Sequence, residues 1–298
     1  MTRSVSPLAE AARHIVLLIG AAIILLPFLY MVSMSLKAPH EIVSNTGGFF
    51  GDQQPMLDEH CAVTALSSDT CMFTPAWHNY TKALFENPLP RYLLNGVIVT
   101  ASIFLLQVLV ALPCAYALAK LKFWGRDVVF GLVLFCLLIP VHAIGVPLYL
   151  MLAKLGMLNS YAALVLPWTI SVFGIFLMRQ FFMTVPDDLV DAARMDGMSE
   201  FAIVWRVMAP TAVPALIAFA IFSVVAHWND YFWPRLVITG NQNLFTPPLG
   251  IREFRNGIDG NQYGPLMATA TIIVVPMVVA FLVAQRRFIE GITLSGMK

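Results

Sequence analysis

The stretch TAVPALIAFAIFSVVAHWNDYF, Thr211–Phe232, decides the fold class of this chain. From Thr211 to Ala226 it contains no ionisable side chain, and its apolar residues continue without alternation. An α-helix needs about 20 apolar residues to cross a hydrocarbon core of about 30 Å, whereas a strand of a membrane barrel needs only about 10 and alternates apolar with polar residues. The stretch therefore predicts a transmembrane helix.

Five further apolar runs lie on either side of this one. They cover residues 15–34, 93–118, 128–152, 161–178 and 265–284. Of the 298 residues, 59% are hydrophobic and 12% are charged, whereas an ordinary soluble domain has about 25% charged residues. We therefore expect an all-α integral membrane protein, a single domain over residues 1–298 with six transmembrane helices. Prolines interrupt most spans and predict kinks there: Pro27, Pro113, Pro140, Pro147, Pro167 and Pro276.

The first run has an alternative interpretation, a cleaved signal peptide. It is longer than the apolar region of a typical signal peptide, and its end, MVSMSLK at residues 31–37, lacks a cleavage site between small residues. We therefore expect it to be retained as a helix.

The basic residues set the predicted orientation, because short loops rich in Lys and Arg stay on the cytoplasmic side. With six spans both termini share one side, and most of the 18 basic residues fall there: Arg3, Arg13, Lys120, Lys122, Arg126, Arg179, Arg194, Arg206, Arg286, Arg287 and Lys298. The others are spread over longer loops. Both termini are therefore predicted to be cytoplasmic.

The loop of residues 36–91 then lies outside and contains Cys61 and Cys71. An oxidising compartment allows such a pair to close a small loop, so we predict a Cys61–Cys71 disulfide; two unpaired thiols are the alternative. Nowhere in the sequence do His, Cys and carboxylate residues show metal-ligand spacing, and no nucleophile can be paired with a base. We expect neither a metal site nor a catalytic site.

One inner loop, residues 179–209, looks soluble. Its start predicts a helix over residues 186–195, because a proline suits the first helical turn and two aspartates follow it. Gly197 permits a turn that a residue with a Cβ resists, and Ser199 can cap a second helix over residues 200–209.

The first of these helices is expected to expose Leu189, Ala192, Ala193 and Met195 as a face of mostly small side chains. A partner protein can approach such a face closely. The alternative is an amphipathic helix lying on lipid, which needs bulky apolar residues flanked by Lys and Arg. Because this helix begins with acidic residues and has alanines in its middle, we favour docking to a protein.

The spacing within DAARMDGMSEFAIVWRVMAP, Asp191–Pro210, resembles the EAA signature of membrane subunits of binding-protein-dependent ABC importers. That signature reads Glu-Ala-Ala, three residues, Gly, nine residues and Ile-x-Leu-Pro. Here Asp191-Ala192-Ala193 is followed at the same spacing by Gly197 and by Val207-Met208-Ala209-Pro210. Glu has become Asp, Ile has become Val and Leu has become Ala. The segment also lies between the fourth and fifth of six spans, as in that family.

Three stretches resemble the carbohydrate-importer branch, in particular the smaller permease of maltose-type systems. They are LMRQFFMTVPDDLVDAARMDG (177–197), WNDYFWP (228–234) and QRRFIEGITLSGMK (285–298). The resemblance covers essentially the whole chain apart from the Cys-bearing loop. It implies the type I ABC importer fold, in a bacterial cell inner (cytoplasmic) membrane.

The resemblance also implies how such a chain works. Its coupling helix would fit a cleft of a cytoplasmic ATPase, the tail 291–298 would reach the same interface, and the loop 240–264 would reach an external solute-binding protein. The coupling residues would be Asp191, Ala192, Ala193, Asp196, Gly197 and Pro210. The further partners would be a second homologous permease and two copies of the ATPase, which would bind ATP and Mg.

This chain contains no G-x-x-x-x-G-K-[ST] phosphate loop, so ATP must be hydrolysed by a partner. We therefore expect a chain that is not an enzyme and that binds no cofactor itself. Nothing in the sequence points to a nucleic-acid partner.

Polar groups at membrane depth are candidates for a substrate path, because an Asp at a helix centre costs about 2.5 to 3.5 kcal/mol. The candidates are His227, Trp228, Asn229, Asp230 and Tyr231 at the end of the fifth span, with Gln107 and His142 deeper in the membrane. For the first group, the alternative is an ordinary aromatic belt with solvated polar residues. For His142, it is a hydrogen bond to a carbonyl freed by Pro140.

The predicted midspans carry no Arg or Lys, which a phosphate would require, so we expect a neutral sugar as the substrate. A polyol or a glycerol-phosphate ester is the alternative. A secondary transporter driven by an ion gradient is the rival function, but it predicts inverted repeats and buried midspan charges, neither of which we find. An intramembrane enzyme would need catalytic polar pairs that the sequence also lacks.

Overall fold

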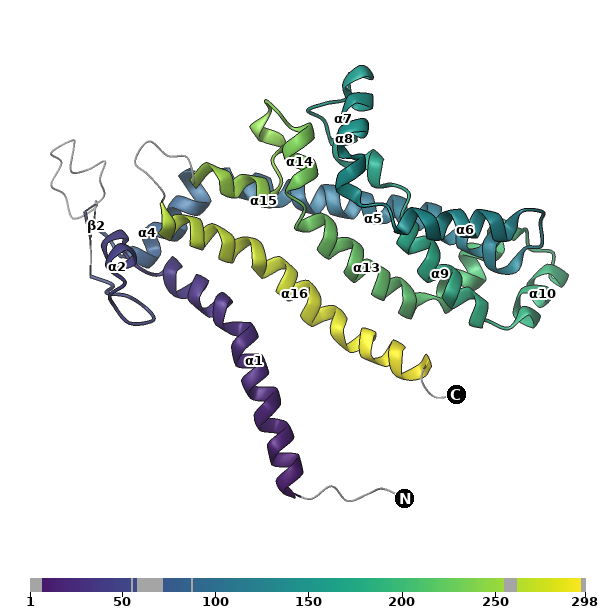
Figure 1. Cartoon of the computed structure of the whole chain (residues 1–298), viewed down its shortest axis with the longest axis horizontal. Coiled ribbons are helices and arrows are strands. Elements are labelled where there is room, and N and C mark those ends of the chain that lie inside the picture. The colour runs from purple at the N-terminus through teal and green to yellow at the C-terminus, as the bar shows by residue number, and fades with distance from the viewer. Residues whose placement is uncertain (1–6, 55, 58–71, 87, 255–261, 296–298) are drawn as a thin grey trace. The chain divides into compact units, whose positions relative to one another are not determined.

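The structure is a computed structural model that describes residues 7–54, 56–57, 72–86, 88–254 and 262–295, and it is predominantly helical (Figure 1). The chain falls into two compact units, and each is described by itself. Unit 1 comprises residues 1–89 and 251–275, and unit 2 comprises residues 90–250 and 276–298. The predicted all-α class is confirmed. The single membrane domain stays a prediction.

Three continuous helices are long and apolar enough to cross a membrane. They are α1 (Pro7–Ser35), α5 (Leu89–Lys120) and α16 (Tyr263–Ser295), and they contain the predicted spans 15–34, 93–118 and 265–284. Each has a proline in its interior that does not end the helix: Pro27, Pro113 and Pro276.

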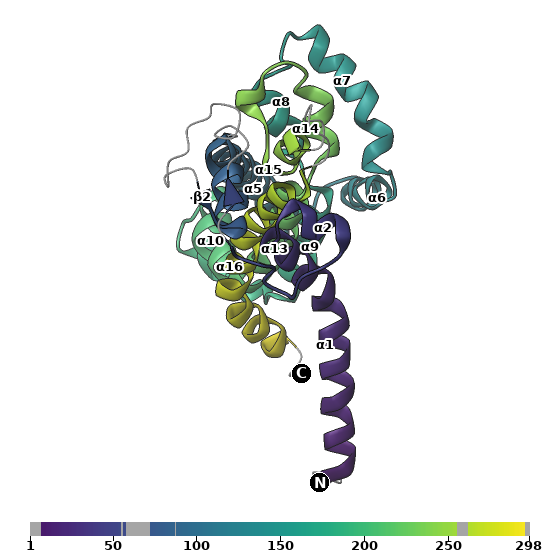
Figure 2. The ribbon, with the colours of Figure 1, turned by 90° about the vertical axis from the view of Figure 1, so that its left-hand side faces the viewer.

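Three further helix pairs pass the same test but are bent, and they bring the number of candidate spans to six if each pair counts as one. Two of these pairs cover the predicted spans 128–152 and 161–178. The first joins α6 (Arg126–Leu137) to η3 (Val141–Ile144) and α7 (Gly145–Lys154) with a bend of 94°, visible in Figure 2 where α7 leaves α6. The second joins α8 (Tyr161–Val165) and η4 (Leu166–Trp168) to α9 (Val172–Thr184) with a bend of 41°. Pro140 lies in the first break, and Pro167 lies in η4 just before the second. A proline removes a helical hydrogen bond.

The third pair is bent by 84° at Ala212. Its second part, α13 (Val213–Trp228), covers most of the predicted span 211–232. Its first part belongs to the predicted inner loop and consists of α11 (Glu200–Ile203), the π-helical turn η5 (Val204–Met208) and α12 (Ala209–Thr211).

Unit 1 contains the described parts of the predicted outer loop: α2 (Pro39–Ser44), β1 (Met56–Leu57), β2 (Met72–Phe73), α4 (Pro75–Thr81) and the π-helical turn η2 (Lys82–Glu86). The two short strands pair antiparallel, an element that the sequence did not predict. Cys61 and Cys71 lie outside the described residues, so their disulfide stays a prediction.

Asn79 joins α4 to the end of α1 within unit 1. Its buried amide donates to the carbonyl oxygens of Ser35, at 3.0 Å, and Lys37, at 2.9 Å. Gly264, at the start of α16, lies so close that a Cβ there would be 2.6 Å from the Asn79 Oδ1. This amide therefore fixes α1 against α4 and leaves room only for a glycine on α16.

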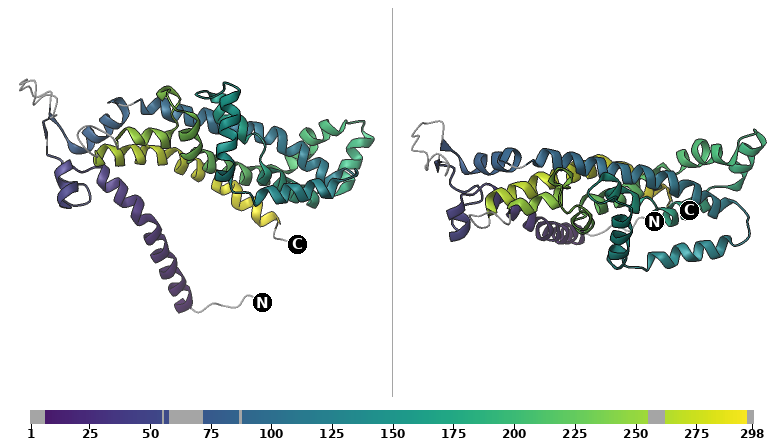
Figure 3. Two further views of the ribbon diagram at one scale, coloured as in Figure 1. Left: turned by 45° about the horizontal axis from the view of Figure 1, so that its top comes forward. Right: turned by 90° about the horizontal axis from the view of Figure 1, so that it is seen from above.

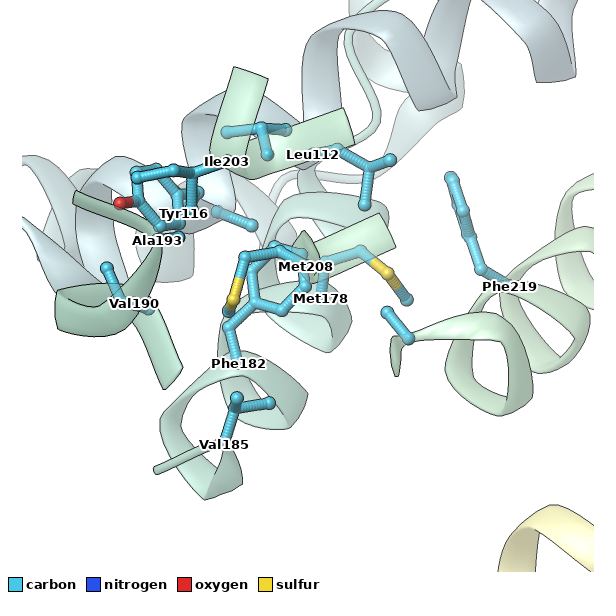
Figure 4. Packing of buried hydrophobic residues seen from close by; sticks show 13 residues of the cluster. Leu112, Tyr116, Met178, Phe182, Val185, Val190, Ala193, Ile203, Met208 and Phe219 are labelled. Carbon is cyan, nitrogen blue, oxygen red and sulfur yellow. The ribbon is translucent and has the colours of Figure 1, made fainter. Parts of the chain in front are cut away.

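Unit 2 is built around one apolar cluster that draws on α5, α9, α13 and the inner loop, including α10 (Asp187–Met195) (Figure 4). Its buried members are Leu112, Ala115, Tyr116, Met178, Phe182, Val185, Val190, Ala193, Ile203, Val204, Met208, Ala212 and Phe219. Gly174 of α9 lies so close to the Phe219 ring of α13 that a Cβ there would overlap it. The inner loop is therefore part of the packed core.

After α13 the chain continues through α14 (Phe232–Val237), η6 (Gln242–Leu244), α15 (Pro247–Gly250) and η7 (Ile251–Phe254). In unit 2, Asn95 of α5 donates to the carbonyl oxygens of Asn243, at 2.8 Å, and Phe245, at 2.9 Å. Asn159 accepts from the N–H groups of Thr239 and Gly240. These two asparagines fix the loop after α14.

Candidate functional site

The inner loop of unit 2 folds as a helical hairpin, at one end of that unit in both views of Figure 3. Its first helix, α10, begins directly after Pro186 and ends at Met195, as predicted. Gly197 has φ +79, and the hydrogen bonds from Met198 N to Ala193 O and from Gly197 N to Arg194 O are those of a Schellman turn. The glycine is required for its backbone conformation, because a Cβ there would meet open space.

The second helix begins where the sequence predicted. The Ser199 hydroxyl caps it by accepting from Ala202 N at 3.3 Å. The helical segment runs past the predicted end at residue 209, through the exposed Pro210, and turns at Ala212. A proline is tolerated at this place because it occupies the first turn of α12.

The exposed face of α10 differs from the predicted one. Leu189, Ala192 and Met195 are exposed, as expected, but Ala193 is only 5% exposed and Val190 only 2%. The prediction that Ala193 is exposed is therefore wrong. Residues three apart share a helix face, so Ala193 follows Val190 into the core, as Figure 4 shows. Asp191, Asp196 and Gly197 remain on the outside.

A polar network ties the two helices of the hairpin to each other. Arg194 donates to Asp191 Oδ1 at 2.9 Å and to Glu200 Oε1 at 2.8 Å. The Tyr116 hydroxyl of α5 donates to the other oxygen of Glu200. Ion pairs at the surface contribute little individually, but this network joins three helices at one point.

Of two further basic residues, Lys120 fixes the start of the hairpin and Arg179 holds the preceding helix α9. Lys120, at the end of α5, donates to the Val185 carbonyl and to Asp187 Oδ1, both at 2.6 Å. Arg179 of α9 is 9% exposed, donates to the Leu118 carbonyl, and places its guanidinium 3.7 Å from the centroid of the Phe130 ring. The hairpin is therefore held by apolar packing, ion pairs and backbone hydrogen bonds.

The contact between Lys120 and Asp187 predicts a pH dependence. The hydrogen bond and charge of Lys120 hold the pKa of the exposed Asp187 carboxyl below its ordinary value of about 3.9. A lowered folded-state pKa adds stability at pH values above the ordinary value, and this is lost as the pH falls through the folded pKa. We expect Asp187→Asn to increase proteolysis of the hairpin at neutral pH, and the difference from the native protein to vanish in acid. A difference that persists in acid would contradict the assignment.

Unit 2 also contains a cavity of about 850 Å³, a size typical of small-molecule sites. Its polar lining residues come from α5, the breaks between α6 and α7 and between α8 and α9, and the end of α13: Gln107, His142, Ser171, Ser223, His227 and Asp230. Its aromatic lining residues are Trp168, Phe173, Phe219, Phe222, Phe232 and Trp233. None of the described residues that line it is Lys or Arg.

A chain of hydrogen bonds centres on Gln107. Its amide accepts from the Ser223 hydroxyl at 2.6 Å, donates to the Trp168 carbonyl at 2.9 Å and lies 3.2 Å from His227 Nε2. The Trp168 carbonyl is available because the helix is broken between α8 and α9. The cavity therefore offers hydrogen-bonding groups beside aromatic rings, a surface that suits hydroxyl groups and the apolar faces of a sugar ring.

The cavity brings together four of the seven residues predicted for the substrate path: Gln107, His142, His227 and Asp230. The other three do not line it. Trp228 is buried beside Gly96, Asn229 donates to its own helix at Val225, and Tyr231 is exposed. The sequence analysis missed two lining residues, Trp168 and Ser223. Trp168 lies in an apolar run with no charged, amide or imidazole neighbour that would single it out. Ser223 is a polar residue at membrane depth, the criterion that selected Gln107, and could have been found. Among the described residues, no group of His, Cys, Asp and Glu is placed to hold a metal.

Comparisons with known proteins agree with this architecture. Residues 107–293 match the family described as binding-protein-dependent transport system inner membrane component. The arabinooligosaccharides transport system permease protein AraQ of Halalkalibacterium halodurans is 37% identical over 204 residues, 68% of this chain and 72% of that protein. The sn-glycerol-3-phosphate transport system permease protein UgpE of Shigella flexneri is 31% identical over 282 residues, 94% of each chain.

A solved structure extends the likeness to the whole fold. A chain of a bacterial ABC transporter involved in the import of the acidic polysaccharide alginate matches with a TM-score of 0.75 and 22% identity. The match covers 97% of this chain and 99% of that one. At this identity the likeness is one of fold.

Proposed function

This chain belongs to the family of binding-protein-dependent transport system inner membrane components, and we propose that its α10 hairpin couples it to a separate ATPase. The chain is a permease subunit of an ABC importer with the type I fold, and it is not an enzyme. The family gives no support to the rival secondary transporter.

The observation that carries the coupling proposal is the way the hairpin is held. One face of α10, with Val190 and Ala193, is buried in the core of unit 2, and the Arg194 network and Lys120 fasten both ends. The opposite face, with Ala192 and Met195, remains exposed. An element that is firmly attached on one side and exposed on the other can take up a partner's motion and pass it to the spans.

The family supports an assembly with several partners. We infer a second homologous permease, two cytoplasmic ATPase copies that bind ATP and Mg, and an external solute-binding protein. In this assembly the hairpin and both termini lie in the cytoplasm, and the loop after α14 faces outward. The chain is an inner-membrane component, as the family description states.

The cavity supports a neutral sugar as the substrate class. Its described lining offers amide, hydroxyl and imidazole groups, aromatic rings and one carboxyl group, but no cation. A phosphate ester would be recognised by Arg or Lys. A polyol shares the same hydroxyl chemistry and is the alternative; a glycerol-phosphate ester would need a cation from the second permease.

Photo-crosslinking tests the coupling proposal in the assembled transporter. Met195, which is 88% exposed on α10, is replaced by the photoreactive amino acid p-benzoylphenylalanine. We expect irradiation to join this position to the ATPase subunit. Asp52, an exposed residue of the predicted outer loop, serves as the matched control and should give no such product. If Met195→Cys is labelled from outside the cell by an impermeant reagent, the coupling proposal is wrong.

A further inference from the structure

A compact loop follows α1 in unit 1 and presents two aromatic side chains to the outside. We refer to residues 37–53 as the Glu41 loop. Phe49 is 44% exposed and Phe50 is 67% exposed, and their rings meet edge to face at 5.2 Å between centroids. Exposed apolar side chains that lie together, rather than singly, can mark a site of contact with a protein or a membrane.

The loop is organised around the buried carboxylate of Glu41, which is 3% exposed. Its two oxygens accept from Ala38 N at 3.0 Å and from Asp52 N at 2.8 Å, so one side chain closes both ends of the loop. Burial raises the pKa of this carboxyl, but these two N–H groups, together with the charges of His40 and Lys37, outweigh that effect and hold the pKa below its ordinary value. The buried Lys37 ammonium donates to the Thr46 carbonyl at 3.1 Å.

Two glycines make this arrangement possible. Gly47 has φ +79 and Gly51 has φ +65, and a Cβ at either position would collide with the Glu41 carboxylate. At Gly51 the distance to Glu41 Oε2 would be 2.7 Å. Gly48, by contrast, has open space around it and an ordinary φ. Phe49 and Phe50, which we call the aromatic tip, are therefore presented by a loop whose conformation is already fixed.

Hydrogen bonds also fix the height of the tip along α1. The Ser33 hydroxyl of α1 donates to the Phe49 carbonyl at 2.7 Å, and Gln53 Nε2 donates to the Leu36 carbonyl at 2.8 Å and to the Phe50 carbonyl. The predicted span 15–34 is about 30 Å long as a helix, the thickness of the hydrocarbon core. Phe49 and Phe50 therefore lie level with the end of the membrane-spanning part of α1.

The apolar surface of α1 continues directly toward this tip. Phe28, Leu29 and Tyr30 are 47%, 53% and 55% exposed, and no residue of the apolar window of α1 is buried in the described structure. We propose that the Glu41 loop is a membrane anchor that inserts Phe49 and Phe50 into the boundary between acyl chains and headgroups of the adjoining lipid leaflet. Phe side chains bury at this boundary in membrane-surface segments, and the preorganised loop loses little conformational entropy on insertion.

Photo-crosslinking to lipid tests the anchor in the complete transporter, reconstituted in phosphatidylethanolamine and phosphatidylglycerol nanodiscs. With p-benzoylphenylalanine at position 50, we expect phospholipid adducts in the mass spectrum of the chain. Leu25, exposed in the middle of α1, is the positive control, and the exposed polar Gln54 is the negative control. If Leu25 gives adducts and position 50 gives none, the proposal is wrong. Products with the solute-binding protein or the second permease, in place of lipid, would also overturn it.

Gly51 and Gly48, whose surroundings differ, supply matched variants. Gly51→Ala forces a Cβ against the carboxylate at a positive φ, so we expect it to lower the adduct yield at position 50 several-fold. Gly48→Ala meets nothing and should leave the yield unchanged. Equal yields in both variants would show that the organised loop does not place the rings. Because ATP hydrolysis is measured separately, failure here leaves the coupling proposal unaffected.

Discussion

Replacing Ala193 with arginine is expected to abolish substrate-stimulated ATP hydrolysis and transport in the assembled importer. Ala193 is 5% exposed and lies in the core of unit 2 beside Val190 and Tyr116. A guanidinium placed there without a partner costs several kcal/mol, so α10 must leave the core to avoid it. The hairpin would then no longer pass motion to the spans. The measurement is stimulated ATP hydrolysis by the complete complex in lipid, with proteolysis of the hairpin as a structural readout.

Ala192→Arg is the matched comparison. Ala192 is the preceding residue on α10 but is exposed, so an arginine there remains solvated and leaves the hairpin attached. We expect normal resistance of the hairpin to proteolysis but weaker coupling, because a long side chain now stands on the face assigned to the ATPase. Full stimulated hydrolysis in both variants would contradict the coupling assignment. Full hydrolysis in Ala192→Arg alone would confine the error to the docking face.

Replacing Gln107 with leucine is expected to lower the transport rate about tenfold. The change removes the acceptor for Ser223 and the donor to the Trp168 carbonyl, and it takes an amide away from the cavity. An interhelical hydrogen bond in a membrane protein averages only about 0.6 kcal/mol, so the fold should survive. A hydrogen bond to the passing substrate is worth up to about 1.5 kcal/mol, and about 1.4 kcal/mol is a tenfold change. Transport into vesicles, normalised to folded complex, measures the effect.

Thr100→Val supplies the control for this experiment in the same helix. Thr100 lies seven positions before Gln107 on α5, is equally buried, and does not line the cavity. Its hydroxyl has no hydrogen-bond partner within the described residues, so a methyl group in its place removes no interaction. Transport should be unchanged. If Gln107→Leu transports at the native rate while remaining folded, the cavity does not belong to the substrate path.

The sequence predicted where the helices lie better than it predicted which spans are single unbroken helices. Long apolar runs are sufficient evidence of helices, and α1, α5 and α16 lie where those runs predicted. Pro140 and Pro167 lie at or beside two of the three bends, yet Pro27, Pro113 and Pro276 lie within unbroken helices. Pro167 leaves the carbonyl of Ala163, four residues earlier, without its helical partner, and Trp233 Nε1 of α14 donates to it at 2.9 Å. Which side chain satisfies such a carbonyl depends on the tertiary packing. Sequence alone does not contain that information.

The same contrast applies to the candidate site. Turn chemistry predicted the hairpin, because Gly197 and Ser199 act through local backbone geometry. The burial of Ala193 was missed, because alanine is small enough for either face of α10 and only the tertiary packing decides between them. For the substrate path, the sequence predicted Trp228 and Tyr231 because they are aromatic residues beside polar ones. The structure instead brings Trp168 to the cavity from a distant stretch of the chain.

Under the coupling proposal, the bend of 84° at Ala212 sets the direction in which movement of the hairpin reaches α13. Ala212 is completely buried, so this corner is packed rather than open. The helical segments before and after Ala212 are therefore held nearly at a right angle to each other. A displacement along the axis of the first segment has almost no component along the axis of α13. It moves α13 sideways or tilts it. We therefore expect spin-label distances measured across α13 to show a tilt or a sideways movement of this helix, not a shift along its own axis, when nucleotide binds.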